Sequence, residues 1–305
     1  MEIPELNVVT GAFGYTGKYI TSRLLSMGKR VRTLTGHPDR HNPFGNQVRV
    51  SPFNFDNQIE QIKSLQGATT LYNTYWVRFS YGEVTFDKAI ENTKTLIKAA
   101  EEAGVSRIIH ISITNASEES SLPYFRGKGI LEKAIINSKL SYAIIRPTVI
   151  FGPEDILINN IAWFLRRFPL LAIFGSGDYR VQPVFVGDVA EIAVSAAHKD
   201  ENIIIDAVGP EIYTFEELVR LIADRIRSRA KIIHLRPELA FFLSRLIGYL
   251  VNDMVLTWDE VEGLISNLLV SENPPIGQIH LSDWLSQNVD RIGTKYASEL
   301  NRHYH

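Results

Sequence analysis

The stretch VVTGAFGYTGKYI, residues 8–20, constrains the fold of this chain more than any other part of it. Gly11, Gly14 and Gly17 are spaced three residues apart between an apolar, strand-like run and a helical pattern. In such a turn the first glycine permits a tight bend, the second lets the backbone approach a pyrophosphate, and the third lets helix and strand pack closely. The helix N-terminus adds amide donors and a positive dipole end. We therefore expect a dinucleotide site, with a tight turn that binds no ligand as the alternative.

Short β-rich runs alternate with helical patterns through the first half of the chain. Strands are expected at 6–10, 31–35, 48–51, 69–74, 107–112 and 141–152, and helices at 17–28, 58–65, 85–104 and 123–137. This alternation is typical of right-handed crossovers and a doubly wound parallel sheet. We predict an α/β protein with a dinucleotide-binding domain over 1–150, to which 183–208 returns. A smaller, mostly helical substrate or partner domain is expected over 151–305.

Composition excludes several classes of function. The chain has 305 residues and a net charge of -2, which gives no reason to expect nucleic acid as a partner. It has no cysteine, which excludes disulfides and a thiolate nucleophile and fits a reducing compartment. The eight histidines form no helical pair with metal-ligand spacing, so no metal site is predicted. A signal peptide is not expected at the N-terminus, and a cytoplasmic location is the expectation.

The most apolar segment is LAFFLSRLIGYLVNDMVL, residues 239–256. Arg245 and Asp253 interrupt it, so we expect no membrane span. The stripe of Phe241, Phe242, Leu246 and Leu250 fits a core or dimer helix. Peripheral membrane or partner association through 239–251 is the alternative.

The end of the second expected strand bears on cofactor choice. Sites that prefer NAD usually place an acidic residue there to hold the ribose 2′-hydroxyl. Thr35 occupies this position, and Arg32, His37 and Arg40 lie nearby. Basic side chains suit a 2′-phosphate, so NADP is favoured over NAD. The alternative is that these basic residues form an ordinary solvated loop.

Several motifs together resemble the short-chain dehydrogenase/reductase superfamily, in its extended or atypical branch, which implies a Rossmann domain. The resemblance covers essentially the whole chain and rests on TGAFGYTG, ENTKTLIKAAEEAGVSRIIHIS, PYFRGK, IIRPTVIFGP and VFVGDVAE. The stretches NTYWVRF, SITN and DILINNIAWFLRRFP are similar to bacterial and archaeal relatives of the 39-kilodalton NAD(P)H-binding accessory subunit of respiratory complex I. Such relatives are often described as epimerase/dehydratase-like.

The resemblance implies roles for individual side chains. Tyr124 and Lys128 match the family's Y-x-x-x-K pair, and Thr114 stands near the position of its third catalytic hydroxyl. The implied cofactor ligands are Gly11, Phe13, Gly14, Tyr15, Thr16, Gly17, Thr35, His37, Arg40, Asp56, Asn73, Thr74, Tyr75, Ser112, Lys128 and Pro147. Two departures affect the floor of the site: the bulky pair YW at 75–76, and SIT at 112–114 in place of a serine pair. The resemblance to the family therefore does not imply a substrate class for this chain.

A tyrosine–lysine pair also has a chemical rationale. Hydride transfer to or from a carbonyl needs a proton donor or acceptor at the substrate oxygen, and free tyrosine, with a pKa of about 10, is a poor base. Lys128, one helical turn from Tyr124, favours the phenolate, and Thr114 would orient the substrate oxygen. The glycines on both sides of Lys128 are expected to let the helix pass close to a cofactor.

The leading hypothesis is an NADP-dependent oxidoreductase that acts on an unknown carbonyl or hydroxyl compound. One alternative is a nucleotide-sugar epimerase that keeps NAD tightly bound. The other is a non-catalytic NAD(P)H-binding assembly or sensor protein, in which the rings of NTYWVRF fill the substrate space. The expected partner is a small molecule, and a homodimer is an open alternative. Arg166 and Arg167 fit either an anionic substrate group or a solvated helix end.

Overall fold

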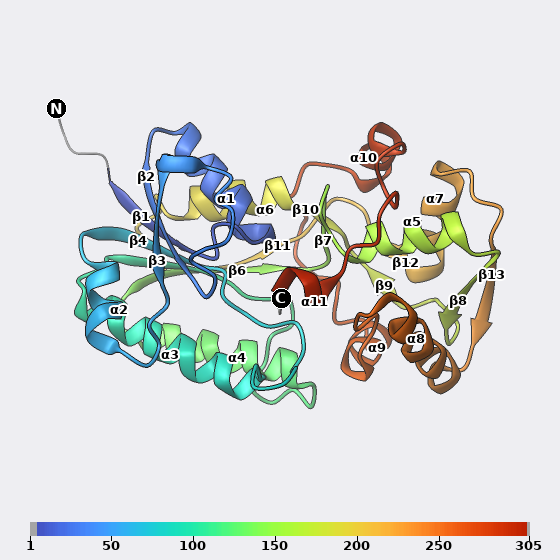
Figure 1. The fold of residues 1–305 in the computed structure, drawn as a ribbon, viewed down its shortest axis with the longest axis horizontal. Coiled ribbons are helices and arrows are strands. Elements are labelled where there is room, and N and C mark those ends of the chain that lie inside the picture. The colour runs from blue at the N-terminus through green and yellow to red at the C-terminus, as the bar shows by residue number, and fades with distance from the viewer. Residues whose placement is uncertain (1–4, 304–305) are drawn as a thin grey trace. The chain divides into compact units, whose positions relative to one another are not determined.

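The computed structural model describes residues 5–303 and divides into two compact units (Figure 1). The chain passes from the first unit to the second after Pro147, returns to the first at Val186, and leaves it again after Ala207. The segments 5–147 and 186–207 therefore form one unit, and 148–185 and 208–303 form the other.

The first unit is built on a seven-stranded sheet with the order β11-β6-β5-β4-β1-β2-β3. Every adjacent pair is parallel. The strands are β1 (Leu6–Thr10), β2 (Arg30–Thr35), β3 (Val48–Pro52), β4 (Ala68–Asn73), β5 (Arg107–Ile111), β6 (Ser141–Pro147) and β11 (Ile203–Ala207). The order reverses between β1 and β4, as in a doubly wound sheet. The predicted α/β fold class is confirmed.

Helices cover both faces of this sheet. One face carries α1 (Tyr15–Ser26) and α6 (Val186–Ala196), and the other carries α2 (Gln58–Leu65), α3 (Phe86–Glu102) and α4 (Pro123–Ile136) (Figure 1). Separate apolar clusters fill the two sides, so the central strands are buried on both faces. This explains why the sequences of these strands are nearly continuous apolar runs.

Local signals account for where these helices begin. Asn57 and Thr85 precede α2 and α3, and each side chain accepts a hydrogen bond from a backbone N–H of the first turn. Pro123 occupies the first turn of α4, where its missing N–H is not needed. The four helices expected in the first half are confirmed to within a few residues; α1 begins at Tyr15 rather than at residue 17.

The strand expected over 141–152 is two strands in different units. β6 ends at Pro147, and β7 (Ile150–Phe151) pairs with β10 (Val184–Phe185) in the second unit. Proline cannot donate to a strand ladder, so a central strand ends readily there. Of the range 183–208 expected to return to the first domain, residues 183–185 and Val208 lie in the second unit. The remainder supplies α6 and β11, and β11 pairs with β6.

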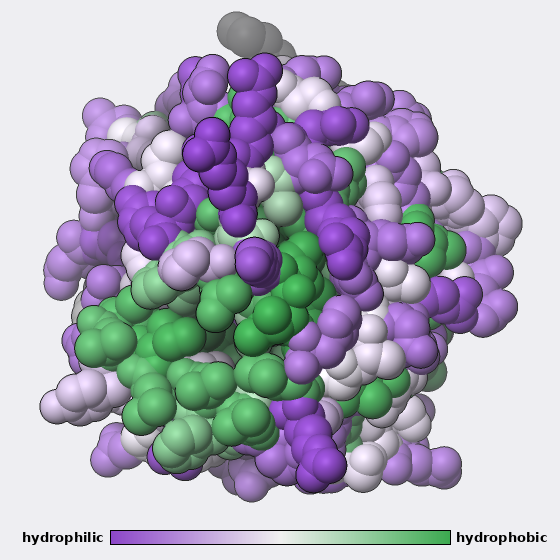
Figure 2. Space-filling view, turned by 90° about the vertical axis from the view of Figure 1, so that its right-hand side faces the viewer, coloured by the Kyte–Doolittle hydropathy of each residue, from purple (hydrophilic) through white to green (hydrophobic). Residues whose placement is uncertain are grey.

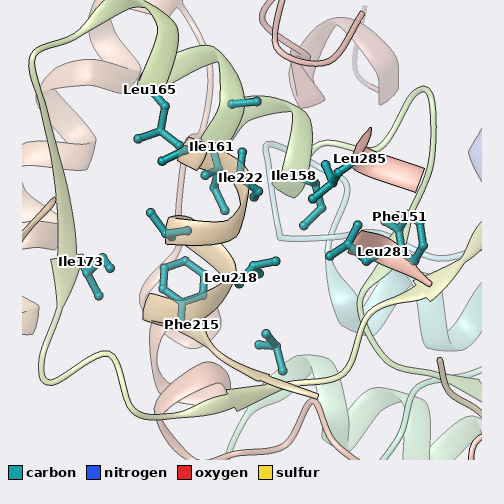
Figure 3. Packing of buried hydrophobic residues seen from close by; sticks show 14 of the residues in the cluster. Phe151, Ile158, Ile161, Leu165, Ile173, Phe215, Leu218, Ile222, Leu281 and Leu285 are labelled. Carbon is teal, nitrogen blue, oxygen red and sulfur yellow. The ribbon is translucent and has the colours of Figure 1, made fainter. Parts of the chain in front are cut away.

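The second unit contains mostly helices and short strands. Besides β7 and β10 it holds α5 (Leu157–Arg167), β8 (Leu170–Phe174), β9 (Arg180–Val181), β12 (Tyr213–Thr214), α7 (Phe215–Arg225), β13 (Lys231–Leu235), α8 (Pro237–Val251), α9 (Trp258–Ile265), α10 (Leu281–Asn288) and α11 (Glu299–His303). Its core lies between the apolar sides of α5 and α7, where Ile158, Ile161 and Leu165 lie near Phe215, Leu218 and Ile222 (Figure 3). None of the helices in residues 5–303 has the length and apolarity needed to cross a bilayer.

The polar side of α5 holds the segment that follows α10. Arg166 Nε donates to the carbonyl of Ile292 at 3.0 Å, and Arg167 Nη2 donates to that of Thr294 at 2.9 Å. Asn160 exchanges two hydrogen bonds with the backbone of Ala297. The two guanidinium groups therefore bind backbone carbonyls. Both side chains are exposed at the end of α5, as expected for a solvated helix end, and anion binding by them stays a prediction.

Candidate dinucleotide and active site

The glycine loop has the tight geometry that its spacing predicts. Gly11 has a positive φ of 64°, and its N–H donates to the carbonyl of Leu34 at 2.8 Å. Gly14 N–H in turn donates to the carbonyl of Gly11 at 2.8 Å. A Cβ atom added to Gly17 would lie 2.2 Å from that same carbonyl oxygen, closer than any real contact. Only glycine at position 17 therefore lets α1 start this close to the loop. Phe13, Tyr15 and Thr16 lie on the same turn, at the start of α1.

Thr10 joins this loop to the loop that follows β4, at the point where the strand order reverses. Its hydroxyl accepts hydrogen bonds from the backbone N–H groups of Thr74 at 2.7 Å and Tyr75 at 3.0 Å, and donates to Asn73 Oδ1 at 3.1 Å. Thr74 Oγ1 donates to the carbonyl of Thr10 at 2.5 Å. The structure thus brings the predicted residues 73–75 beside the glycine loop, in the crevice where such sheets bind ligands. Sequence reasoning missed Thr10, although it stands directly before Gly11.

A buried histidine supports the same loop. Asn73 Oδ1 accepts from Thr10 and from the N–H of Tyr75, so its Nδ2 faces His110 Nδ1 at 3.0 Å. His110 Nδ1 is then the acceptor, and the proton sits on Nε2, which has no hydrogen-bond partner among residues 5–303. Burial, together with the charge of Lys128, lowers the pKa of His110 well below its usual value and keeps the ring neutral. The sequence signal was a polar residue inside the apolar strand RIIHI.

Tyr124 and Lys128 meet at one side chain, Trp76. The Tyr124 ring lies edge-on to the Trp76 ring with centroids 5.8 Å apart, and it also contacts Phe86 at 6.1 Å. Lys128 Nζ lies 4.8 Å from the centroid of the Trp76 ring and donates to the carbonyl of Ile111 at 2.7 Å. The two predicted residues therefore share one face of α4. Trp76, which the sequence marked only as a bulky departure, belongs to the loop after β4 and contacts both of them.

Lys128 is fully enclosed by the protein. Burial lowers the pKa of its ammonium from 10.5 to about 7, and the nearby Glu132 carboxylate opposes part of that shift. The ammonium at neutral pH is therefore held by the Ile111 carbonyl and the Trp76 ring rather than by water.

We expect the folded protein to become more stable as the pH rises from about 7 towards 10.5 because of Lys128. In this range the unfolded chain keeps the proton on Lys128 and the folded chain has lost it, so raising the pH favours folding. The variant Lys128→Met should lack this increase. Urea midpoints of both proteins across the range test it, and parallel curves would show that Lys128 is not the group responsible.

The glycines beside Lys128 make room for other parts of the protein. A Cβ atom on Gly127 would lie 2.6 Å from Trp76, and one on Gly129 would lie 2.3 Å from the backbone of Ser117 and Glu118. The contacts that exclude a side chain at these two positions are therefore with the protein itself, and an approach of the helix to a cofactor stays a prediction. The two glycines let α4 accept the Trp76 ring on one side and a chain segment on the other.

The two hydroxyls that follow β5 have acceptors within the protein. Ser112 donates to the Glu132 carboxylate, which also accepts from Arg146 Nε at 2.9 Å. Thr114 Oγ1 donates to the carbonyl of Arg146 at 3.1 Å, and its backbone N–H donates to that of Pro147 at 2.9 Å. The predicted residues Ser112, Thr114 and Pro147 are thus close together, and the roles of the two hydroxyls in binding cofactor or substrate stay predictions.

The residues expected to select the cofactor differ in their burial and in their positions. Arg32 Nη1 donates to the carbonyl of Ser64 at 2.6 Å, so this side chain is held at the end of α2. Thr35 is buried, and its hydroxyl accepts from the N–H of His37 at 3.1 Å. The His37 side chain is exposed and that of Arg40 is half-buried, both on the loop that follows β2. Asp56 lies exposed in the turn after β3.

A parallel, doubly wound sheet with a glycine-rich turn at its switch point defines a dinucleotide-binding protein of the Rossmann type. Residues 7–208 match the model of the NAD dependent epimerase/dehydratase family, and the chain belongs to this family. The cofactor class that the site supports is therefore a pyridine nucleotide.

Known relatives and solved structures agree with this assignment. The chain is 28% identical over 285 residues to the mitochondrial NADH dehydrogenase [ubiquinone] 1 alpha subcomplex subunit 9 of Arabidopsis thaliana, with 87% of this chain and 71% of the relative covered. This confirms the predicted kinship with the complex I accessory subunit. An NADPH-dependent quinone oxidoreductase of Escherichia coli has a similar fold, with a TM-score of 0.73 at 18% identity over 93% of this chain and 98% of that one. A nucleoside-diphosphate-sugar epimerase of Staphylococcus aureus gives a TM-score of 0.70 at 17% identity over 96% and 99%.

Proposed function

We propose that this protein is an NADPH-dependent oxidoreductase that reduces a carbonyl compound or oxidises the corresponding alcohol. The observation that carries the proposal is the common contact of Tyr124 and Lys128 with Trp76, on one face of α4. A protein that only binds a nucleotide has no need of a buried ammonium next to a tyrosine, since burying a lysine is costly. Ionisable groups with strongly shifted pKa values cluster at catalytic and binding sites.

The residues present fit a pyridine nucleotide. The glycine loop has no room for a side chain at position 17, and the backbone N–H groups at the start of α1 can hold a pyrophosphate. Trp76 Nε1 is buried without a hydrogen-bond partner among residues 5–303, a donor that a bound ligand would satisfy. When bound, the nicotinamide supplies or accepts the hydride.

The protein's own part in the reaction is to move a proton. In this proposal Tyr124 gives a proton to the carbonyl oxygen during reduction and takes it back during oxidation. Lys128 favours the phenolate while it is charged, so its support for Tyr124 is strongest below its pKa of about 7. Thr10, Asn73 and His110 fix the loop after β4, and so fix Trp76 next to Tyr124.

The side chains around Tyr124 favour a flat, weakly polar substrate. Trp76, Phe86 and Phe125 all pack against its ring. A sugar needs hydrogen-bond partners for its hydroxyls, and burying them against aromatic faces would leave them unpaired. A quinone or an aryl ketone fits such a wall better. The fold shared with an NADPH-dependent quinone oxidoreductase supports this choice.

A panel of quinones, aryl ketones and nucleotide sugars, each mixed with NADPH and the protein, tests the proposal. We expect NADPH oxidation with at least one flat carbonyl compound and none with the nucleotide sugars. NAD that co-purifies in stoichiometric amount, with epimerisation of a nucleotide sugar, would establish the epimerase alternative instead.

A non-catalytic NAD(P)H-binding assembly protein is the second candidate. The Trp76 ring already covers the Lys128 ammonium, which in this candidate would keep the lysine from the cofactor. The relatives among complex I subunits also favour it. NADPH would then raise the melting temperature, and no compound of the panel would be reduced.

The loop after β2 supports a preference for NADP, and Arg40 is the side chain to test. We expect Arg40→Ala to weaken NADPH binding by about tenfold or more, the loss typical of a charge-assisted hydrogen bond to a phosphate, and to leave NADH binding nearly unchanged. Titration calorimetry with both nucleotides measures this. Arg30→Ala, at the opposite end of β2, removes the same charge and serves as the control. An equal loss of affinity for both nucleotides, or no loss for either, would show that Arg40 does not bind the 2′-phosphate.

A further inference from the structure

Helix α8 carries a continuous apolar stripe on its outer side. Its exposed large side chains are Leu239, Phe242, Leu243, Leu246, Tyr249 and Leu250. The spacings of three, four and seven residues place them on one helical face. Tyr249 and Leu250 are 89% and 80% exposed, whereas Ala240 and Gly248 are the buried residues of the helix. An ordinary surface helix has the opposite arrangement, with its apolar stripe against the core.

The stripe is large enough to be a binding surface. A fully exposed aromatic side chain presents roughly 150–250 Å² and a leucine a similar order. Because these six side chains are between 37% and 89% exposed, together they offer on the order of 700 Å². The largest apolar patch of a typical monomer is about 300–600 Å². Figure 2 shows a broad hydrophobic area on the end of the second unit that faces the viewer.

A basic segment borders the stripe. Residues 224–245 contain six basic side chains and two acidic ones, although the whole chain has a net charge of -2. The side chains of Arg227, Arg229, Lys231 and Arg236 are all exposed. Lys231 pairs in register with the exposed Leu170 on β8, the strand against which α8 packs. Positive charge and exposed apolar side chains therefore lie together on this side of the second unit.

We propose that α8 lies in the interface of a lipid bilayer that contains anionic lipids. An interfacial helix buries an apolar face at the level of the headgroups and gains further from basic residues near anionic lipid. Tyr249, which is 89% exposed, has the amphipathic ring that favours that depth. A second copy of the chain fits less well, because a symmetric antiparallel contact along α8 would place Arg245, near the middle of the helix, next to its like-charged counterpart.

Co-sedimentation of the full chain with vesicles tests this. We expect the protein to pellet with phosphatidylcholine vesicles containing a third of phosphatidylglycerol, and much less with phosphatidylcholine alone or in high salt. The double variant Leu246→Gln and Leu250→Gln should lower the bound fraction by about tenfold or more, since it removes two apolar anchors. Both side chains are exposed, so the variant should fold.

The matched control is Ile59→Gln with Ile204→Gln, which removes two exposed apolar side chains from the first unit and should leave vesicle binding unchanged. Arg227→Gln with Arg229→Gln should reduce binding to the anionic vesicles specifically. Vesicle binding that is equal for neutral and anionic lipid, or that is unchanged in the double leucine variant, would overturn the proposal. A wild-type dimer that the leucine variant dissociates, with no vesicle binding, would assign the face to a second copy instead.

Discussion

Replacing Tyr124 with phenylalanine is expected to lower kcat by about 10²–10⁴-fold, the usual contribution of a positioned general acid or base. The change removes the hydroxyl that gives the proton to the substrate oxygen and keeps the ring that packs against Trp76 and Phe86. NADPH affinity should change by less than about twofold, since an effect on chemistry alone leaves binding intact. Steady-state rates with a substrate found in the carbonyl panel, together with a nucleotide titration, measure both quantities.

The control for this variant is Tyr142→Phe, which removes a hydroxyl from β6 and should change neither value. Unchanged turnover in Tyr124→Phe would reject Tyr124 as the proton donor. Equal losses of turnover, NADPH affinity and stability would show that the tyrosine only supports the structure.

The substitution Gly17→Ala is expected to abolish measurable NADPH binding. Its new Cβ atom would lie 2.2 Å from the Gly11 carbonyl oxygen and 2.8 Å from the Gly11 carbonyl carbon, both of them backbone atoms. The start of α1 must then move away from the turn, which separates the amide donors that a pyrophosphate needs. We also expect the free energy of unfolding to fall by about 1–3 kcal/mol, as for other overpacked sites.

Denaturant unfolding and a nucleotide titration of the same preparation measure these effects. Gly36→Ala is the stability control, because its Cβ atom would make an ordinary 3.9 Å contact with Phe53. Wild-type NADPH affinity in a folded Gly17→Ala protein would contradict the proposed position of the cofactor.

Local patterns predicted most of the nucleotide-binding unit. Each helix of the first half has its own periodicity and end signal, such as Thr85 before α3 or Pro123 at the start of α4. The glycine loop was identifiable because its spacing coincides with a strand-to-helix junction. These features depend on neighbours within a few residues, so a single sequence contains them.

The features that sequence reasoning missed depend on contacts between distant residues. Nothing near Gly127 indicates that it makes room for Trp76, some fifty residues earlier in the chain. Thr10 and His110 gain their roles only because β1, β4 and β5 are neighbours in the sheet. The backbone acceptors of the two arginines of α5 were missed for the same reason, since they lie more than 120 residues away in sequence.

The two glycines on either side of Lys128 determine how closely α4 is packed. Gly127 and Gly129 let α4 be enclosed by an indole and a backbone segment, and Lys128 is thereby buried. This enclosure sets the pKa of Lys128 to about 7, so the same packing that weakens the helix tunes the group next to Tyr124. Packing and proposed chemistry are therefore linked through Trp76.

Transfer of deuterium from C4-labelled NADPH to a carbonyl compound is the most direct measurement of the proposed function. The wild-type protein is predicted to convert an aryl ketone to an alcohol deuterated at its carbinol carbon, with NADP in equal amount, and to reduce a quinone to a hydroquinone whose label exchanges with water. Tyr124→Phe is predicted to do neither at a comparable rate. Labelled NADPH that binds and stabilises the wild-type protein, yet passes no deuterium to any aryl ketone and reduces no quinone, would contradict the proposed oxidoreductase.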